Sequence, residues 1–222
     1  MAARAMEKNG TIVRKKHSIK DEFSLISVLT IPIAVAVNIV GDQIVQALKL
    51  PIFLDAIGVI FMGMISGPWT ACVAGILTNL VEGIVDNPTL IPFAITSAAT
   101  GLVTGFFARA GWFSDRKKRW KVIIVLLCLV ASTICTASPI TVFAFGGVSG
   151  NGGQSLAIAA LLATGQNIWA SVVGTDLIVN TIDRAISIAI SYAVINVMPA
   201  RTLIKYDLGS QYVKTGEKEN QS

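Results

Sequence analysis

The sequence predicts an all-α integral membrane protein, a bundle of six transmembrane helices with both termini in the cytoplasm. Of the 222 residues, 53% are hydrophobic and only 14% are charged, and the mean hydropathy is +0.68. A soluble domain of this size carries about 25% charged residues. The composition therefore argues against a water-soluble globule, a disordered tail and a nucleic-acid-binding module, although the net charge is +5.

Six apolar segments are candidates for the spans, since a membrane helix needs about 20 mostly apolar residues. They lie at residues 23–48, 52–66, 69–85, 91–113, 122–145 and, after a short apolar segment at 156–164, in a long helix that ends near residue 198. Polar or proline-containing breaks separate them. The break at 146–153 is rich in glycine and favours a mobile lid over the outer face.

The positions of the cationic residues support the count of six. Sixteen of the 18 Lys and Arg lie before Asp21, between residues 109 and 121, or after Pro199. With six spans these three stretches all face the cytoplasm, as the positive-inside rule requires. We expect a basic arm at 1–22, a transmembrane domain at 23–199 and a polar tail at 200–222, in the cell membrane of a prokaryote.

The sequence offers little for catalysis or for metal binding. His17 is the one histidine, the three cysteines lie in apolar runs without a C-x-x-C motif, and no P-loop motif is present. We therefore expect no metal, no other cofactor, no ATP hydrolysis by the P-loop route and no enzymatic activity.

Polar side chains at membrane depth are the candidate binding residues. Ionisable groups inside spans are costly and usually mark a pathway or a site. In the last span such residues recur about once per helical turn and form one polar stripe. We expect a cavity open to the outside, formed by Asn38, Asp42, Asp55, Asn79, Trp169, Asp176, Asn180, Asp183 and Arg184. The alternative is that some of these residues only join helices, and Asp55 could simply cap the second one.

Small residues four positions apart allow membrane helices to pack closely. Gly101 and Gly105 form an intact GxxxG motif, and Ala71 and Gly75 form a related pair in the preceding span. We expect both pairs to hold neighbouring helices together.

Several segments resemble the substrate-binding S components of energy-coupling factor (ECF) type ABC transporters. They are NIVGDQIV at 38–45, LKLPIFLDAIG at 48–58, SGPW at 66–69, AGILTNL at 74–80 and DRAISIAISY at 183–192. The resemblance extends over residues 23–199. It implies a subunit that captures a water-soluble vitamin or similar micronutrient from outside, with cobalamin as the substrate it suggests.

The same resemblance implies partners. An S component docks through small residues of its first helix, here Thr30 and Ala34, onto a transmembrane coupling subunit that is driven by two ATPase subunits. Two alternatives remain open from the sequence. One is a stand-alone secondary transporter of a small polar solute, and the other is a membrane-embedded enzyme that uses Asp176 and Asp183. The lipid bilayer is an expected partner in every case, and nucleic acid in none.

Overall fold

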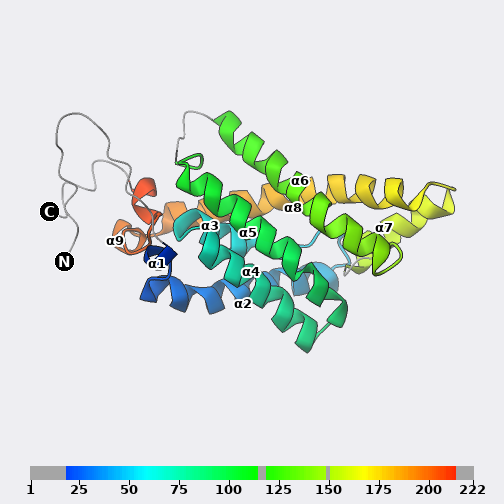
Figure 1. The fold of residues 1–222 in the computed structure, drawn as a ribbon, viewed down its shortest axis with the longest axis horizontal. Coiled ribbons are helices and arrows are strands. Elements are labelled where there is room, and N and C mark those ends of the chain that lie inside the picture. The colour runs from blue at the N-terminus through cyan, green and yellow to red at the C-terminus, as the bar shows by residue number, and fades with distance from the viewer. Residues whose placement is uncertain (1–18, 115–118, 149–150, 214–222) are drawn as a thin grey trace.

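The computed structural model describes residues 19–114, 119–148 and 151–213, and within these ranges the chain is helical with no strand. The expected basic arm up to residue 18 and the basic residues 116–118 lie outside the described residues. In chain order the helices are α1 (Ile19–Glu22), α2 (Leu25–Ala47), α3 (Ile57–Ile65), α4 (Pro68–Val85), η1 (Pro88–Phe93), α5 (Ala94–Arg109), α6 (Arg119–Phe143), α7 (Gly152–Ala163), α8 (Ile168–Val197), α9 (Ala200–Leu203) and η2 (Gly209–Tyr212) (Figure 1).

Five of the described helices are long and apolar enough to cross a membrane, which makes the chain a multi-pass membrane protein. They are α2, α4, the continuous stretch Pro88–Arg109, α6 and α8. The count of six spans is not confirmed. The second expected span, at 52–66, contains only the nine residues of α3. At 1.5 Å per residue such a helix covers less than half of the roughly 30 Å hydrocarbon core.

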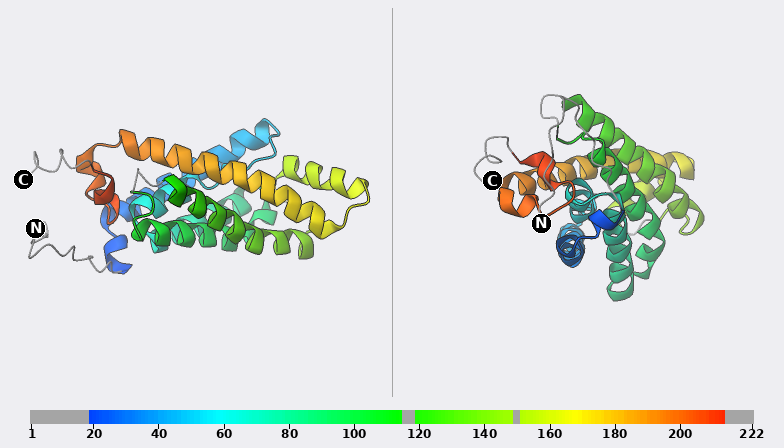
Figure 2. Two further views of the ribbon diagram at one scale, coloured as in Figure 1. Left: turned by 90° about the horizontal axis from the view of Figure 1, so that it is seen from above. Right: turned by 60° about the vertical axis from the view of Figure 1, so that its left-hand side comes forward.

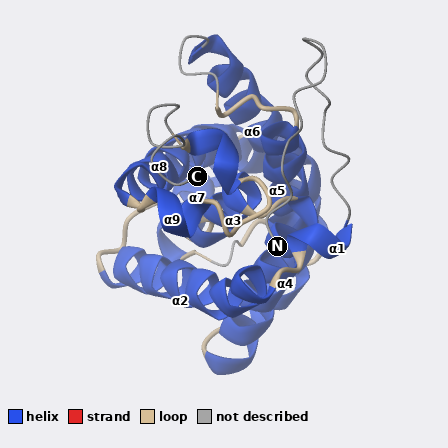
Figure 3. Cartoon of the chain, turned by 90° about the vertical axis from the view of Figure 1, so that its left-hand side faces the viewer, coloured by secondary structure: helices blue, strands red, loops and turns tan. Residues whose placement is uncertain are grey.

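The short helix α3 lies among longer helices. It packs against α2, α4, α5 and α8, and the end-on view shows it near the middle of the bundle (Figure 3). All its residues except Ile57 and Phe61 are buried. Because α3 is surrounded by protein, the irregular backbone that precedes it does not have to face lipid, where unpaired peptide groups are not tolerated.

The α4–α5 interface forms through the small residues that the sequence singles out. A Cβ atom on Gly101 would lie 2.6 Å from the carbonyl carbon of Ala71, and one on Gly105 would lie 2.2 Å from the nitrogen of Pro68. A Cβ on Gly75 would lie 2.6 Å from the carbonyl oxygen of Ser97. The expected role of these small residues in helix packing is confirmed, since only glycine fits at such distances.

The first and last described helices lie at the same end of the bundle (Figures 1 and 2). Residues expected in a polar tail pack there: Leu203, Tyr206 and Leu208 are buried in the core. The backbone N–H of Leu208 donates to the carbonyl of Ile65, at the end of α3, with an N···O distance of 2.9 Å. The cytoplasmic location of this end stays a prediction.

Replacing Gly58 tests the close approach of α3 to α2. A Cβ on Gly58 would lie 2.2 Å from the carbonyl oxygen of Ala34, whereas a Cβ on Gly174 of α8 would meet nothing within 4 Å. We expect Gly58→Ala to lower the free energy of unfolding by about 2 kcal/mol, the usual cost of overpacking. Gly174→Ala should leave it unchanged or raise it, since alanine favours helix. Thermal unfolding in detergent checks both variants, and equal midpoints would contradict the packing described here.

Candidate functional site

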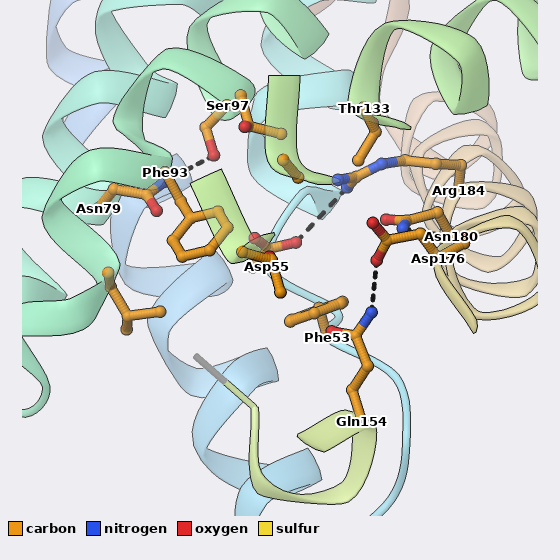
Figure 4. Close-up of a pocket in the computed structure, with 14 residues that line it drawn as sticks. Phe53, Asp55, Asn79, Phe93, Ser97, Thr133, Gln154, Asp176, Asn180 and Arg184 are labelled. Carbon is orange, nitrogen blue, oxygen red and sulfur yellow. Dashed lines mark hydrogen bonds and ion pairs between the residues drawn. The ribbon is translucent and has the colours of Figure 1, made fainter. Parts of the chain in front are cut away.

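A cavity lies between the segment before α3 and the helices α4 to α8 (Figure 4). It holds about 470 Å³ of space, including the part that is open to the exterior. Its walls combine carboxylate, guanidinium, amide and hydroxyl groups with two phenylalanine rings. The lining residues are Phe53, Asp55, Asn79, Leu90, Phe93, Thr96, Ser97, Thr133, Ala137, Thr141, Gln154, Asp176, Asn180 and Arg184.

One wall of the cavity is the non-helical segment 50–56, which packs against α2, α7 and α8. Leu54 has a φ of 53°, a left-handed conformation that is costly for a residue with a side chain. Asp183 stabilises it, because its Oδ1 accepts the backbone N–H of Leu54 at 2.7 Å. Asn151 donates from Nδ2 to the carbonyl of Ile52, also at 2.7 Å. A Cβ on Gly41 of α2 would lie 2.4 Å from the Leu54 carbonyl oxygen, so the segment lies directly on α2.

Asn38 of α2 holds the start of α3, directly after this segment. The first N–H groups of a helix have no partner within the helix, and Ala56 at the N-cap position has no side-chain oxygen to offer. The Oδ1 of Asn38 accepts the N–H of Gly58 at 2.6 Å, and its Nδ2 donates to Oγ1 of Thr78 at 3.0 Å. Asn38 on α2 thus caps α3 and connects it to α4.

The charged groups of the cavity centre on Arg184, whose side chain is 4% exposed. Its Nη1 lies 3.1 Å from Oδ2 of Asp183 and 3.4 Å from Oδ1 of Asp55. Asp183 is fully buried, whereas the Asp55 side chain is 21% exposed and borders the cavity. Arg184 therefore links the polar stripe of α8 to the segment before α3, as Figure 4 shows for its contact with Asp55.

A second polar group gathers around Asp176. Its carboxylate accepts hydrogen bonds from the Ser138 hydroxyl and from Nε2 of Gln154, the latter at 2.5 Å. The Nδ2 of Asn180 donates to the backbone carbonyl of Asp176 at 2.9 Å. Helices α6, α7 and α8 thus meet at one carboxylate. Gln154 can reach it because α7 folds back along the start of α8 (Figure 2).

The structure divides the expected binding residues into two sets. Five of them line the cavity: Asp55, Asn79, Asp176, Asn180 and Arg184. For these residues contact with a ligand stays a prediction. The other four do not line the cavity, and they are Asn38, Asp42, Trp169 and Asp183.

The four residues outside the lining make contacts within the protein. Asn38 and Asp183 bind backbone N–H groups from behind the cavity wall. The Asp42 carboxylate accepts a hydrogen bond from Gln46 on its own helix. Trp169 packs edge-on against Phe143, with ring centroids 5.3 Å apart, and is 39% exposed.

The expected docking residues of α2 also face inward. Thr30 is 8% exposed and its hydroxyl lies 2.9 Å from the Tyr206 hydroxyl. Ala34 is 3% exposed and lies beneath Gly58 of α3. In the structure both side chains are occupied by contacts within the chain.

Several residues that line the cavity were not among the expected binding residues. The spacing of some of them in the sequence could have indicated them. Thr133, Ala137 and Thr141 follow one another at intervals of four, so they share one face of α6. That span, at 122–145, carries no charged residue that would mark a site. Phe53, Phe93 and Gln154 offer no such pattern, because only the tertiary fold brings them to the cavity.

The described residues contain no group of three His, Cys, Asp or Glu side chains that could hold a metal ion.

A family model matches residues 9–144, more than half of the chain: 5TM-5TMR_LYT, described as the 5TMR of 5TMR-LYT. The chain belongs to this family. It is a five-transmembrane, LytS-type family of sensor domains of histidine kinases. The match ends at the close of α6, so α7 and α8, with four of the lining residues, lie beyond it. No curated protein and no solved structure significantly matches the chain.

Membership of the 5TM-5TMR_LYT family overturns the resemblance to ECF S components, and with it the function of a substrate-binding uptake subunit and the choice of cobalamin. The alternatives of a secondary transporter and a membrane-embedded enzyme do not fit the family either. The residues behind the resemblance, such as Gly58 and Gly75, serve close helix packing. Such packing is a general need of membrane bundles. The coupling subunit and ATPases were expected from that resemblance alone, and no described feature tests them.

A double-mutant cycle tests the role of Asp183 and Arg184. Asp183→Ala removes the acceptor of the Leu54 N–H and the nearer partner of a buried guanidinium. We expect it to lower the free energy of unfolding by about 3 kcal/mol, the scale of a broken buried pair. The double variant with Arg184→Ala should lose less than the sum of the single losses, because neither member of the buried Asp183–Arg184 pair is left without the other.

The exposed Asp86, which accepts from Gln43, provides a matched control. Chemical denaturation of Asp86→Ala in the same detergent should show little change. Additive losses in the Asp183 and Arg184 cycle would contradict the pairing.

Proposed function

We propose that this chain is the ligand-sensing module of a receptor in the cell membrane of a prokaryote. It binds a small polar molecule in the cavity, does not convert it chemically, and passes its occupancy to the end of the bundle that holds α1 and α9. Membership of a family of sensor domains supports this role. The cavity supports it too, since concave sites with a few converging polar groups are the usual form of small-molecule sites.

The observation that carries the proposal is the position of α3 between the cavity and that end. Asp55 borders the cavity and comes two residues before Ile57, the first residue of α3. At the other end of α3 the carbonyl of Ile65 accepts the N–H of Leu208 at 2.9 Å. A short, buried helix moves as one body, so a shift at Asp55 would reach residues 200–213 directly.

A second set of contacts joins α1 to the start of α4, which follows α3 directly. The chain leaves α3 through Gly67, whose φ is 125°, and enters α4 at Pro68. The fully buried Glu22 of α1 accepts the N–H of Trp69 at 2.8 Å and forms an ion pair with Arg109 of α5. Movement of α3 would thus bear on α1 as well as on α9.

The ion pair between Arg184 and Asp55 is a contact that a bound ligand would break. A ligand can shift a conformational equilibrium only by binding two states with different affinity. A molecule that contacts Arg184 or Asp55 competes with their mutual contact, which at 3.4 Å is the longer of the two that Arg184 makes. Releasing Asp55 would free one side of segment 50–56, while Asp183 still holds Leu54.

The test begins with a thermal-shift screen of the purified protein against a library of small polar metabolites. A ligand that binds the native state raises the unfolding midpoint by mass action. Asn180→Leu places a larger apolar side chain in the cavity wall and should abolish the rise. Thr181→Leu is the matched control on the same helix, since the Thr181 hydroxyl donates to the Leu177 carbonyl and Thr181 does not line the cavity.

Compounds that pass the screen are then examined by hydrogen–deuterium exchange in lipid nanodiscs. We expect binding to change exchange both in residues 51–65 and in residues 200–213, because α3 connects them. A change confined to the cavity walls would contradict a sensing role. Stabilisation that survives Asn180→Leu would place the ligand elsewhere.

A further inference from the structure

We propose that the cavity selects a small organic cation, a molecule with a protonated amine and at least one oxygen acceptor, held between Asp55 and Asp176. This inference rests on the proposed function only in taking the cavity as the ligand site, and it names the chemical class of the ligand.

The charge balance of the cavity is the first argument. Its lining contains two carboxylates, Asp55 and Asp176, and one guanidinium, Arg184. That guanidinium is shared, because it pairs with the buried Asp183 at 3.1 Å and with Asp55 at 3.4 Å. One cation thus faces three carboxylates, and a cationic ligand would restore the balance.

Further carboxyl groups lie near Asp55. Asp42 and Glu82, both buried, each interact electrostatically with Asp55. The Oε1 atom of Glu82 is buried without a hydrogen-bond partner among the described residues. Lys49, the cation nearest in sequence to Asp55, is exposed.

Asp176 is a buried carboxylate that has no cation as a hydrogen-bond partner among the described residues. Asp176 is 3% exposed, and the groups that donate hydrogen bonds to its carboxylate, the Ser138 hydroxyl and the Gln154 amide, are both neutral. Burying a carboxylate without a cation is expensive. An ammonium group in the cavity would offset that cost, whereas an anionic ligand would add to it.

Two unpartnered polar atoms point independently to a ligand. Thr96 lines the cavity and is 6% exposed, yet its Oγ1 has no hydrogen-bond partner in the described structure. Such an oxygen can accept from an ammonium. The Nε–H of Arg184, also buried and unpartnered, is a donor only, and it calls for an acceptor oxygen on the ligand.

The apolar walls fit the same class of ligand. Phe53 and Phe93 line the same cavity as Asp55 (Figure 4). The face of an aromatic ring attracts a cation, more strongly where water is excluded. The cavity therefore combines carboxylates, a hydroxyl without a described hydrogen-bond partner and aromatic rings around one limited space.

The experiment compares three probes built on the same two-carbon skeleton: ethanolamine hydrochloride, ethylene glycol and sodium glycolate. They carry a positive charge, no charge and a negative charge, and are added at tens of millimolar at equal ionic strength to the purified full chain. We expect ethanolamine to raise the unfolding midpoint, and glycol and glycolate to leave it unchanged. The concentration dependence of the midpoint gives the affinity.

Variants assign the effect to the cavity. Asp176→Asn keeps the shape and removes the charge, so the affinity for ethanolamine should fall at least tenfold. Asp55→Asn should also lower the affinity for ethanolamine, and it replaces Asp176→Asn in the test if that variant does not fold. The matched control Asp86→Asn removes an exposed carboxylate outside the cavity and should keep the affinity of the parent protein.

The remaining outcomes distinguish a wrong ligand charge from a wrong binding site. If ethanolamine gives no shift, or if Asp176→Asn and Asp55→Asn both keep full affinity for it, the preference for a cation is overturned. If ethylene glycol or glycolate stabilises the parent protein but not Asn180→Leu, the preference for a cationic ligand is overturned. The cavity then remains the ligand site. If Asn180→Leu leaves an ethanolamine shift unchanged, binding lies elsewhere and the proposed site fails as well.

Discussion

The structure depends on satisfying the backbone of a non-helical segment within a membrane bundle. Between α2 and α3 the chain is irregular from residue 50 to residue 56, and peptide groups at membrane depth need partners because lipid supplies none. Side chains from other helices supply them: Asp183 accepts the N–H of Leu54, Asn151 donates to Ile52, and Asn38 caps α3 at Gly58. Polar residues that would be costly in a plain span are used here to hold backbone in place.

The same constraint explains why the cavity and α3 occur together. The irregular segment shortens the second crossing, which leaves α3 with nine residues among longer helices. It also brings Asp55 beside Arg184 at the cavity wall. Because α3 begins at that wall and ends at the bond to Leu208, the chain has a direct link from the cavity to the end where α1 and α9 lie. A sensor needs such a link.

Composition and periodicity predict the class of fold and most helices, but not this segment. The apolar run at 52–66 has the average hydropathy of a membrane span, so its residues alone predict a continuous helix. Nothing in this run shows that the N–H of Leu54 will donate to Asp183, far away in sequence, and leave the helix to begin only at Ile57. Small-residue packing was predictable, since Gly101 and Gly105 act through local spacing. Five of the nine expected binding residues line the cavity, and three of them, Asp176, Asn180 and Arg184, belong to the α8 stripe, which has a clear helical period. The resemblance to S components misled because it rested on glycine and proline positions, which many membrane bundles share, and the family match corrects it.

Amide hydrogen exchange at Leu54 and Gly58, resolved by NMR in detergent or nanodiscs, tests the central claim most directly. Both N–H groups lie in or next to an irregular segment, yet each is bonded to a side chain of another helix. The account predicts slow exchange at both positions, comparable with the interior of α3, and faster exchange at Leu54 once Asp183 is replaced by alanine. Exchange in the unaltered protein as fast as in an unstructured peptide would show that the segment is not held, and would contradict the account.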